Sequence, residues 1–512
     1  MTNDQWPITH THIPASMITP LHRRQTPAFW GIVTFVLIAL GFIRSSLNYN
    51  TPYLDECDYI FVGRALLSGE PWITKTYMFS SDIHLYLYGI ADRIFSGESS
   101  YIAARALAGL MGLASLWFFY GFVRTLYIKH TDSRRIAELS TLLLALTVPH
   151  TFISQFATYD VVCFMFFTAS LWLLAKSVVR EEHDTPLRKV LILLGGSLLY
   201  ALAVLAKYVV IAYLPLFFLA LLLLNRRAAV IFAVVVGIAL GGYVMLYRTE
   251  LLQLYQNQIL GSHKANATLV KILGTALEYS GFTILVALSL VWTRKEKILP
   301  AWYYVALAVF ALPLVAYHVR SGDVISLYKH VVYACCFCAP VAGEALYALL
   351  CRAVERDNDW LRALGAAIVV VACALLGWQL RAVQNAYPNT EIVTRLVRST
   401  MSPHTTILSE DAYLFRYACF PTIPTKNLEE MTWFDNNMDG KRENQDVIDA
   451  VWEGKFEYVY LNGLILRELG NELKRGVLRN RYDLVLNIPY TNSEVMNPIN
   501  TGFLSLYRRR SR

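Results

Sequence analysis

Apolar runs long enough to cross a membrane recur along the first three quarters of this chain. A transmembrane helix needs about 20 predominantly apolar residues. Eleven runs come close to this length, so the pattern predicts a polytopic α-helical membrane domain over residues 28–380. The runs lie near residues 28–45, 102–123, 136–154, 160–179, 189–206, 208–224, 228–247, 276–292, 300–318, 330–350 and 361–380.

Lys and Arg residues concentrate in alternate loops between these runs. Positively charged loops mark the cytoplasmic side of a membrane protein. With eleven spans, the basic loops and the polar tail 1–27 fall on one side, which is therefore predicted to be cytoplasmic. The long loop 46–101 and everything after residue 380 are then extracytoplasmic, in a plasma (inner) membrane.

The pattern changes after residue 380. Short apolar runs, among them TTILSE, FEYVYLN, YDLVLNI and FLSLY, are separated in part by helical stretches such as ENQDVIDAVWEG and LILRELGNELKRGVL. Strands that alternate with amphipathic helices are typical of an α/β fold. Residues 381–512 are therefore predicted to form a small extracytoplasmic α/β domain.

Composition agrees with a membrane protein. Charged residues make up 16% of the chain, against roughly 25% in soluble proteins, and the mean hydropathy is +0.40. The net charge of +8 lies mostly in the short basic loops, where it sets topology, so it does not indicate a nucleic-acid partner.

Acidic residues mark the first outer loop. Asp55 and Glu56 follow the first apolar run by a few residues, and Asp160 opens a later run after the short FATY turn, on the same side of the membrane. Carboxylates beside a bilayer are costly unless they face water or perform chemistry. The alternatives are solvated loop acids for the first pair and a helix N-terminal acid for Asp160. Asp82 and His84 add polar groups within the same loop.

Basic residues occupy the same predicted side. Arg105 starts the second run, Lys207 interrupts an apolar stretch, and Lys329 with His330 opens the tenth run. Each one alone could simply extend to lipid headgroups. Together, near an acidic pair, they suit an anionic ligand such as a lipid phosphate.

These motifs resemble a known superfamily. DECDYIFVGRALLSGEPW (55–72), YIAARALAGLMG (101–112), FATYD (156–160) and LAKY (205–208) look like the first part of the GT-C membrane glycosyltransferases. The branch most similar is the bacterial one related to protein O-mannosyltransferases and lipid A aminoarabinose transferases. The chain departs from it in SSDIHLYLYG (80–89), which lacks the usual Pro-Pro, and in LYKHVVY (327–333), where Arg-Tyr is common.

The resemblance implies transfer of a sugar from a polyprenyl-phosphate donor to a hydroxyl group of a glycan, lipid or protein acceptor, at the outer membrane face. A carboxylate must then take the acceptor proton, which is expected to be Asp55, with inversion at the anomeric carbon. Glu56 and Asp160 complete the predicted catalytic set. Cations can stabilise the leaving phosphate.

Further roles follow from the same resemblance. Donor phosphate binding is predicted for Arg105, Lys207, Lys329 and His330. Substrate binding is predicted for Tyr59, Asp82, His84 and Tyr208. Besides the donor and the acceptor, only membrane lipids are expected as partners. A divalent metal is left open, and no other cofactor is predicted.

Two other functions remain as alternatives. A transporter or flippase of a lipid-linked sugar would place its acids near the midplane, in two related halves, whereas the acids here gather at one face. A non-catalytic assembly subunit would need another chain for activity.

Overall fold

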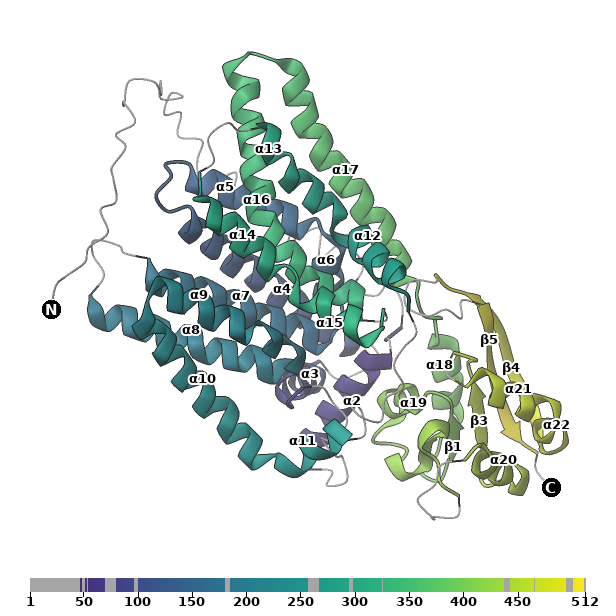
Figure 1. Cartoon of the computed structure of the whole chain (residues 1–512). Helices are drawn as coiled ribbons and strands as arrows, with labels where there is room; N and C mark the ends of the chain where they lie inside the picture. The colour runs from purple at the N-terminus through teal and green to yellow at the C-terminus, as the bar shows by residue number, and fades with distance from the viewer. Residues whose placement is uncertain are drawn as a thin grey trace.

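The computed structural model describes residues 47, 51–52, 54–69, 80–95, 100–179, 185–256, 267–293, 298–324, 326–436, 443–464, 466–493 and 501–510. Figure 1 shows a bundle of long helices with a smaller α/β region at one end. The predicted fold class, a polytopic helical membrane protein with a C-terminal α/β region, is confirmed.

Within the described residues, eight helical spans are long and apolar enough to cross a membrane. They are α4 (Ser100–Leu126), α7 (Tyr159–Val178), α8 (Pro186–Ala206), α10 (Arg226–Leu246), α12 (Leu269–Leu288), α14 (Ala301–Phe310) with α15 (Pro313–Ser321), α16 (Leu327–Glu355) and α17 (Asp359–Gln384).

Three of the eleven expected runs are not among these eight spans of the described residues, each for its own reason. The run 136–154 is a pair of helices, α5 (Ser133–Ala145) and α6 (Val148–Gln155), bent by 67°, which counts as a ninth span if taken as one. The run 208–224 is short and begins as the 3-10 helix η1 (Tyr208–Tyr213) before α9 (Leu214–Leu224). The first run, 28–45, lies outside the described residues.

The core of the bundle surrounds α16. In its most apolar window 72% of the residues are buried, against 17% for α10 and α17 on the periphery. Small residues let neighbouring backbones approach closely in membrane helices. At Gly343 a methyl group would lie 2.0 Å from Ser140 Oγ and 2.7 Å from the Ser140 nitrogen of α5.

The segment predicted as the first outer loop, 46–101, contains two helices that pack together, α2 (Leu54–Leu67) and α3 (Ile83–Ile94). They touch at two glycines: a methyl group on Gly63 would lie 2.1 Å from Leu85 O, and one on Gly89 would lie 2.4 Å from Gly63 C. No side chain fits there, so the glycines fix how α2 and α3 are held against each other.

The C-terminal region is a mixed sheet with helices on both faces. The strand order is β2-β1-β3-β5-β4, with β2, β1 and β3 parallel and β5 antiparallel to both neighbours. The strands are β1 (Ile407–Ser409), β2 (Leu428–Glu430), β3 (Tyr458–Leu461), β4 (Tyr482–Thr491) and β5 (Thr501–Arg509). The helices are α18 (Glu391–Thr400), α19 (Ala412–Cys419), α20 (Asn444–Glu453), α21 (Arg467–Arg475) and α22 (Val477–Arg481).

Side-chain alternation along β3 explains the layers. Successive residues of a strand point to opposite faces. Tyr458 and Tyr460 pack into the core that continues into the membrane bundle, while Val459 and Leu461 pack into a separate core under α20 and α21.

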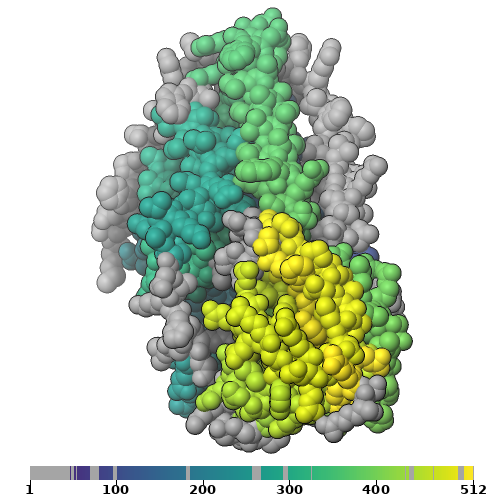
Figure 2. Space-filling view, turned by 90° about the vertical axis from the view of Figure 1, so that its right-hand side faces the viewer, coloured from purple at the N-terminus to yellow at the C-terminus, as the bar shows by residue number. Residues whose placement is uncertain are grey.

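One arginine joins α2, α3 and the C-terminal region. Arg64 of α2 forms two hydrogen bonds of 2.7 Å with Asp92 of α3. It also donates to the carbonyl oxygens of Tyr417 and Phe420, at and just after the end of α19. The α/β region therefore sits at the end of the bundle that carries α2 and α3 (Figure 1). Figure 2 shows the same region, coloured yellow and yellow-green, at the lower end of the molecule.

Candidate active site

Four charged side chains, three from the first turns of helices and one from the break between α8 and η1, meet at this end of the bundle. Lys207 Nζ donates to Asp160 Oδ1. Lys329 Nζ lies 3.4 Å from Asp160 Oδ2 and 3.6 Å from Asp55 Oδ2. Lys329 therefore bridges the two carboxylates, and we call these four residues the charged cluster.

Helix ends place all four residues at the same level. Asp55, Asp160 and Lys329 occupy the first turns of α2, α7 and α16. Lys207 lies between α8 and η1 with φ −156° and ψ 111°, an extended conformation that interrupts the helix. Carboxylates are favoured at helix N-termini, and the interruption lets the Lys207 side chain turn toward one of them.

Exposure separates the two carboxylates. The Asp160 side chain is 5% exposed and is held by two lysines and by Thr158 Oγ1 at 3.1 Å. The Asp55 side chain is 36% exposed and has Lys329 on one side. Asp55 is thus the accessible acid of the cluster, and Asp160 is the buried one.

The surroundings of Asp55 tune its basicity. Partial burial raises the pKa of the Asp55 carboxyl, Lys329 lowers it, and the charge of Asp160 raises it again. The result is a pKa above the ordinary value, so the ionised form is a stronger base than a free aspartate.

His330 follows Lys329 in α16 and belongs to a chain of hydrogen bonds. Its Nδ1 lies 2.7 Å from Nε2 of His318 in α15, and Nδ1 of His318 lies 2.6 Å from the carbonyl oxygen of Asp323. Its other nitrogen, Nε2, is buried and has no hydrogen-bond partner within the described part of the chain. His318 had no predicted role, because a lone histidine in an apolar run gives no signal of its distant partner.

Arg105 and Glu56 lie together instead. Arg105 donates to both carboxylate oxygens of Glu56, at 2.8 and 2.6 Å, and both side chains are fully buried. Arg105 also donates to the carbonyl oxygens of Leu47 and Thr51, and Glu56 accepts from the Ala157 nitrogen. The pair connects α2, α4 and the turn before α7, which is a positioning arrangement that holds Asp55 and Asp160 at one level.

The four residues predicted to bind substrate lie around α3 and η1. Tyr59 packs edge-on against His84 with ring centroids 4.6 Å apart, and both rings contact Tyr159. Burial lowers the pKa of His84 to about 3, so this ring is neutral. Tyr208 bonds the Tyr243 hydroxyl at 2.8 Å, and the half-buried Asp82 lies within electrostatic range of Tyr208.

Part of the chain is similar to a family of known proteins. Residues 57–237 match the PMT family, described as dolichyl-phosphate-mannose-protein mannosyltransferase. The match covers about a third of the chain, which is similar over these residues to the GT-C glycosyltransferases of this family. The predicted resemblance and enzyme class, a glycosyltransferase that uses a lipid-phosphate-linked sugar, are confirmed. No curated protein sequence matches the chain.

Solved structures share the fold of this glycosyltransferase. ArnT from Cupriavidus metallidurans, bound to undecaprenyl phosphate, superposes with a TM-score of 0.60 at 13% identity, over 94% of this chain and 98% of ArnT. The Archaeoglobus fulgidus oligosaccharyltransferase AglB, in complex with an inhibitory peptide and a dolichol-phosphate, gives 0.57 at 12%, over 93% and 76%. At these identities the likeness shows the fold alone.

The charged cluster does not fit a divalent metal. Among the described residues, no three His, Cys, Asp or Glu side chains group in a way that could hold a metal ion. Both Asp160 oxygens of the glycosyltransferase face lysines, and the Asp55 oxygen nearest the cluster faces Lys329. The charged cluster therefore does not offer the set of ligands that a divalent metal needs.

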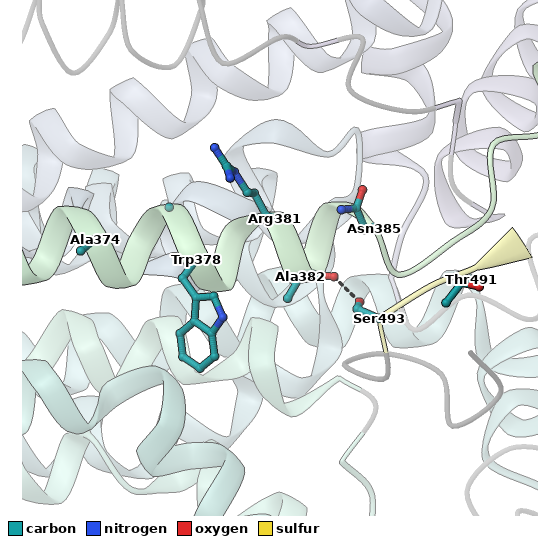
Figure 3. Close-up of a pocket in the computed structure, with 8 residues that line it drawn as sticks. Ala374, Trp378, Arg381, Ala382, Asn385, Thr491 and Ser493 are labelled. Carbon is teal, nitrogen blue, oxygen red and sulfur yellow. Dashed lines mark hydrogen bonds between the residues drawn. The ribbon is translucent and has the colours of Figure 1, made fainter. Parts of the chain in front are cut away.

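A cavity of about 620 Å³ lies elsewhere, between α17 and the end of β4. Figure 3 shows Trp378 and Arg381 extending from the helix, with Ser493 Oγ bonded to the Ala382 carbonyl oxygen. None of the described residues that line this cavity is a predicted site residue.

Proposed function

We propose that the protein transfers a sugar from a polyprenyl-phosphate donor to an acceptor hydroxyl, with inversion, and that Asp55 is the general base. The observation that carries this is the bridge made by Lys329 between an accessible carboxylate and a buried one. It holds a carboxylate that can take the acceptor proton next to a cation that can stabilise the leaving phosphate, as a single displacement requires.

The acceptor oxygen attacks the anomeric carbon while its proton passes to a carboxylate oxygen of Asp55. The bond from the anomeric carbon to the phosphate oxygen breaks, and polyprenyl phosphate leaves with the electron pair. Lys329 and Lys207 stabilise its negative charge, so no general acid is needed. Asp160 keeps both lysines in place.

We also propose that this reaction occurs on the extracytoplasmic face of a plasma (inner) membrane. The basic residues Arg124, Arg134, Arg226 and Arg352 lie at ends or loops of the spans opposite to the charged cluster, and positive loops are cytoplasmic. The α/β region, proposed as a separate domain over 381–512, would then face outward beside α2 and present or recognise the acceptor.

The test is transfer in membrane vesicles from labelled polyprenyl-phosphate donors that carry different sugars. Asp55→Asn keeps the shape of the side chain and removes the base, and should lower transfer by about 10²–10⁴-fold. The matched control is Asp357→Asn, an acid 90% exposed at a distant loop, which should leave transfer unchanged. Undiminished transfer by Asp55→Asn would remove Asp55 as the base.

A further inference from the structure

The hydrogen-bond chain through His318 and His330 has a fixed direction. A carbonyl oxygen can only accept, so Nδ1 of His318 carries the proton that it donates to Asp323 O. A neutral His318 then has an unprotonated Nε2, which must accept from Nδ1 of His330. A neutral His330 with a proton on Nδ1 has a bare lone pair on Nε2.

The alternative direction adds charge to the pair. If His330 carried its proton on Nε2 instead, its Nδ1 would accept from Nε2 of His318, and both nitrogens of His318 would have to be protonated. That would place a third cation in a buried region where Lys207 and Lys329 already interact electrostatically with His330. The Asp323 side chain lies close to His318, and its negative charge would favour a doubly protonated His318. The protonation state of His318 is therefore measured directly.

The bare nitrogen lies beside the charged cluster. His330 is 5% exposed, its ring is close to Asp160, and its Nε2 has no hydrogen-bond partner among the residues that the structure describes. A buried acceptor without a hydrogen bond is destabilising, so a donor group supplied by a substrate would remove that penalty. A phosphate oxygen cannot supply that group, because it would meet the lone pair as a second acceptor.

We propose that Nε2 of His330 accepts a hydrogen bond from a hydroxyl group of the donor sugar, and that His318 is the positioning residue that keeps His330 an acceptor. This rests on the proposed function and changes the predicted role of His330 from phosphate binding to sugar recognition. His330 thereby selects for a sugar with a hydroxyl at one ring position.

The protonation state is tested without any substrate. In protein labelled with ¹⁵N-histidine, the His330 signals are identified by their loss in His330→Gln. Nδ1 is expected to resonate as a protonated nitrogen and Nε2 as a bare one. A protonated Nε2 on His330, or a doubly protonated His318, would overturn the proposal and leave the proposed transfer reaction standing.

Binding tests the role of the bare nitrogen. The probes are short-chain polyprenyl-phosphate mannose, glucose and galactose, monodeoxy analogues of the tightest binder, and sugar-free polyprenyl phosphate. One deoxy analogue should bind the wild type about 10-fold more weakly. His318→Phe should lose about 10-fold for the parent sugar and no longer distinguish that analogue, while its affinity for sugar-free polyprenyl phosphate stays unchanged.

Two variants act as controls. His318→Gln can donate to Asp323 O and accept from His330 through one amide, so it should keep wild-type affinity. His404→Gln changes an exposed histidine of the α/β region and should do the same. Equal losses by His318→Phe for sugar-linked and sugar-free probes would assign His330 to the phosphate and refute the subsite. Binding of none of the probes by the wild type would refute the donor class itself.

Discussion

The bridge from Lys329 to Asp55 gives the most direct test of the proposed base. Replacing Lys329 with Gln keeps a polar side chain of similar length and removes the positive charge 3.6 Å from Asp55 Oδ2. Because that charge lowers the pKa of Asp55, its removal should raise the pKa further. A base acts only when deprotonated, so transfer should be lost at a higher pH as the solution is acidified.

The distance sets the size of the shift. Two unit charges 3.6 Å apart interact with about 1 kcal/mol at the dielectric constant of water and about 5 kcal/mol at an effective value of 20. One pKa unit corresponds to about 1.4 kcal/mol. Since 36% of the Asp55 side chain is exposed, solvent screening puts the interaction near the lower limit. The pH below which kcat/KM falls should therefore rise by about one unit; we call this part of the pH profile the acid limb.

The assay is kcat/KM for transfer between pH 4 and 8. Lys329→Arg retains the charge and should keep the wild-type limb, and Lys271→Gln, an exposed lysine on α12, serves as the control for loss of a positive charge. A lower plateau with an unmoved limb would mean that Lys329 acts on the phosphate alone and that Asp55 is not the group that titrates.

Three further predictions concern the framework of the site. Gly63→Ala forces a methyl group against Leu85 O and should destabilise the α2–α3 pair by about 1–3 kcal/mol, seen as a lower melting temperature, with Gly237→Ala in open space as the control. Arg64→Met leaves the buried Asp92 without its bidentate partner and should cost about 3–5 kcal/mol, with earlier proteolytic release of the α/β region; unchanged cleavage would contradict the anchoring role. Burial, and then the charge of Glu430, raises the pKa of Asp411 to about 7, so the folded state holds this proton and stability falls as pH rises from 5 to 8. Asp411→Asn should stabilise the protein at pH 8 more than at pH 5 in thermal unfolding, and an equal effect at both values would refute the titration.

Hydrophobic periodicity predicted the helical bundle because each span must be apolar over its whole length. It could not tell a straight span from the bent pair α5–α6, since both have the same composition. In the α/β region, four of the expected strands are present as β1, β3, β4 and β5. The three-residue β2 was missed because Leu-Glu-Glu shows neither apolar alternation nor β-propensity.

The neighbouring acids Asp55 and Glu56 show what residue spacing could not decide. Consecutive positions on a helix point about 100° apart, so two adjacent carboxylates on α2 cannot both face one pocket. The sequence does not say where the first turn of α2 points. In the structure Glu56 turns inward to Arg105, and Asp55 remains toward Lys329.

The difference in surroundings also explains why the two acids of the charged cluster, Asp55 and Asp160, suit different tasks. A carboxylate enclosed by two lysines, such as Asp160, is held as a fixed negative charge and is a poor proton acceptor for an incoming hydroxyl. A carboxylate with one lysine on one side and solvent on the other can take up a proton and release it to water. Asp160 without its lysines would compete for that proton, so Lys207 matters to the reaction partly by keeping Asp160 ionised while Asp55 reacts. Loss of Lys207 should therefore lower the rate of transfer even from a sugar donor whose leaving group is not a phosphate. If Lys207 served only to bind the phosphate, its loss would not change the rate with such a donor.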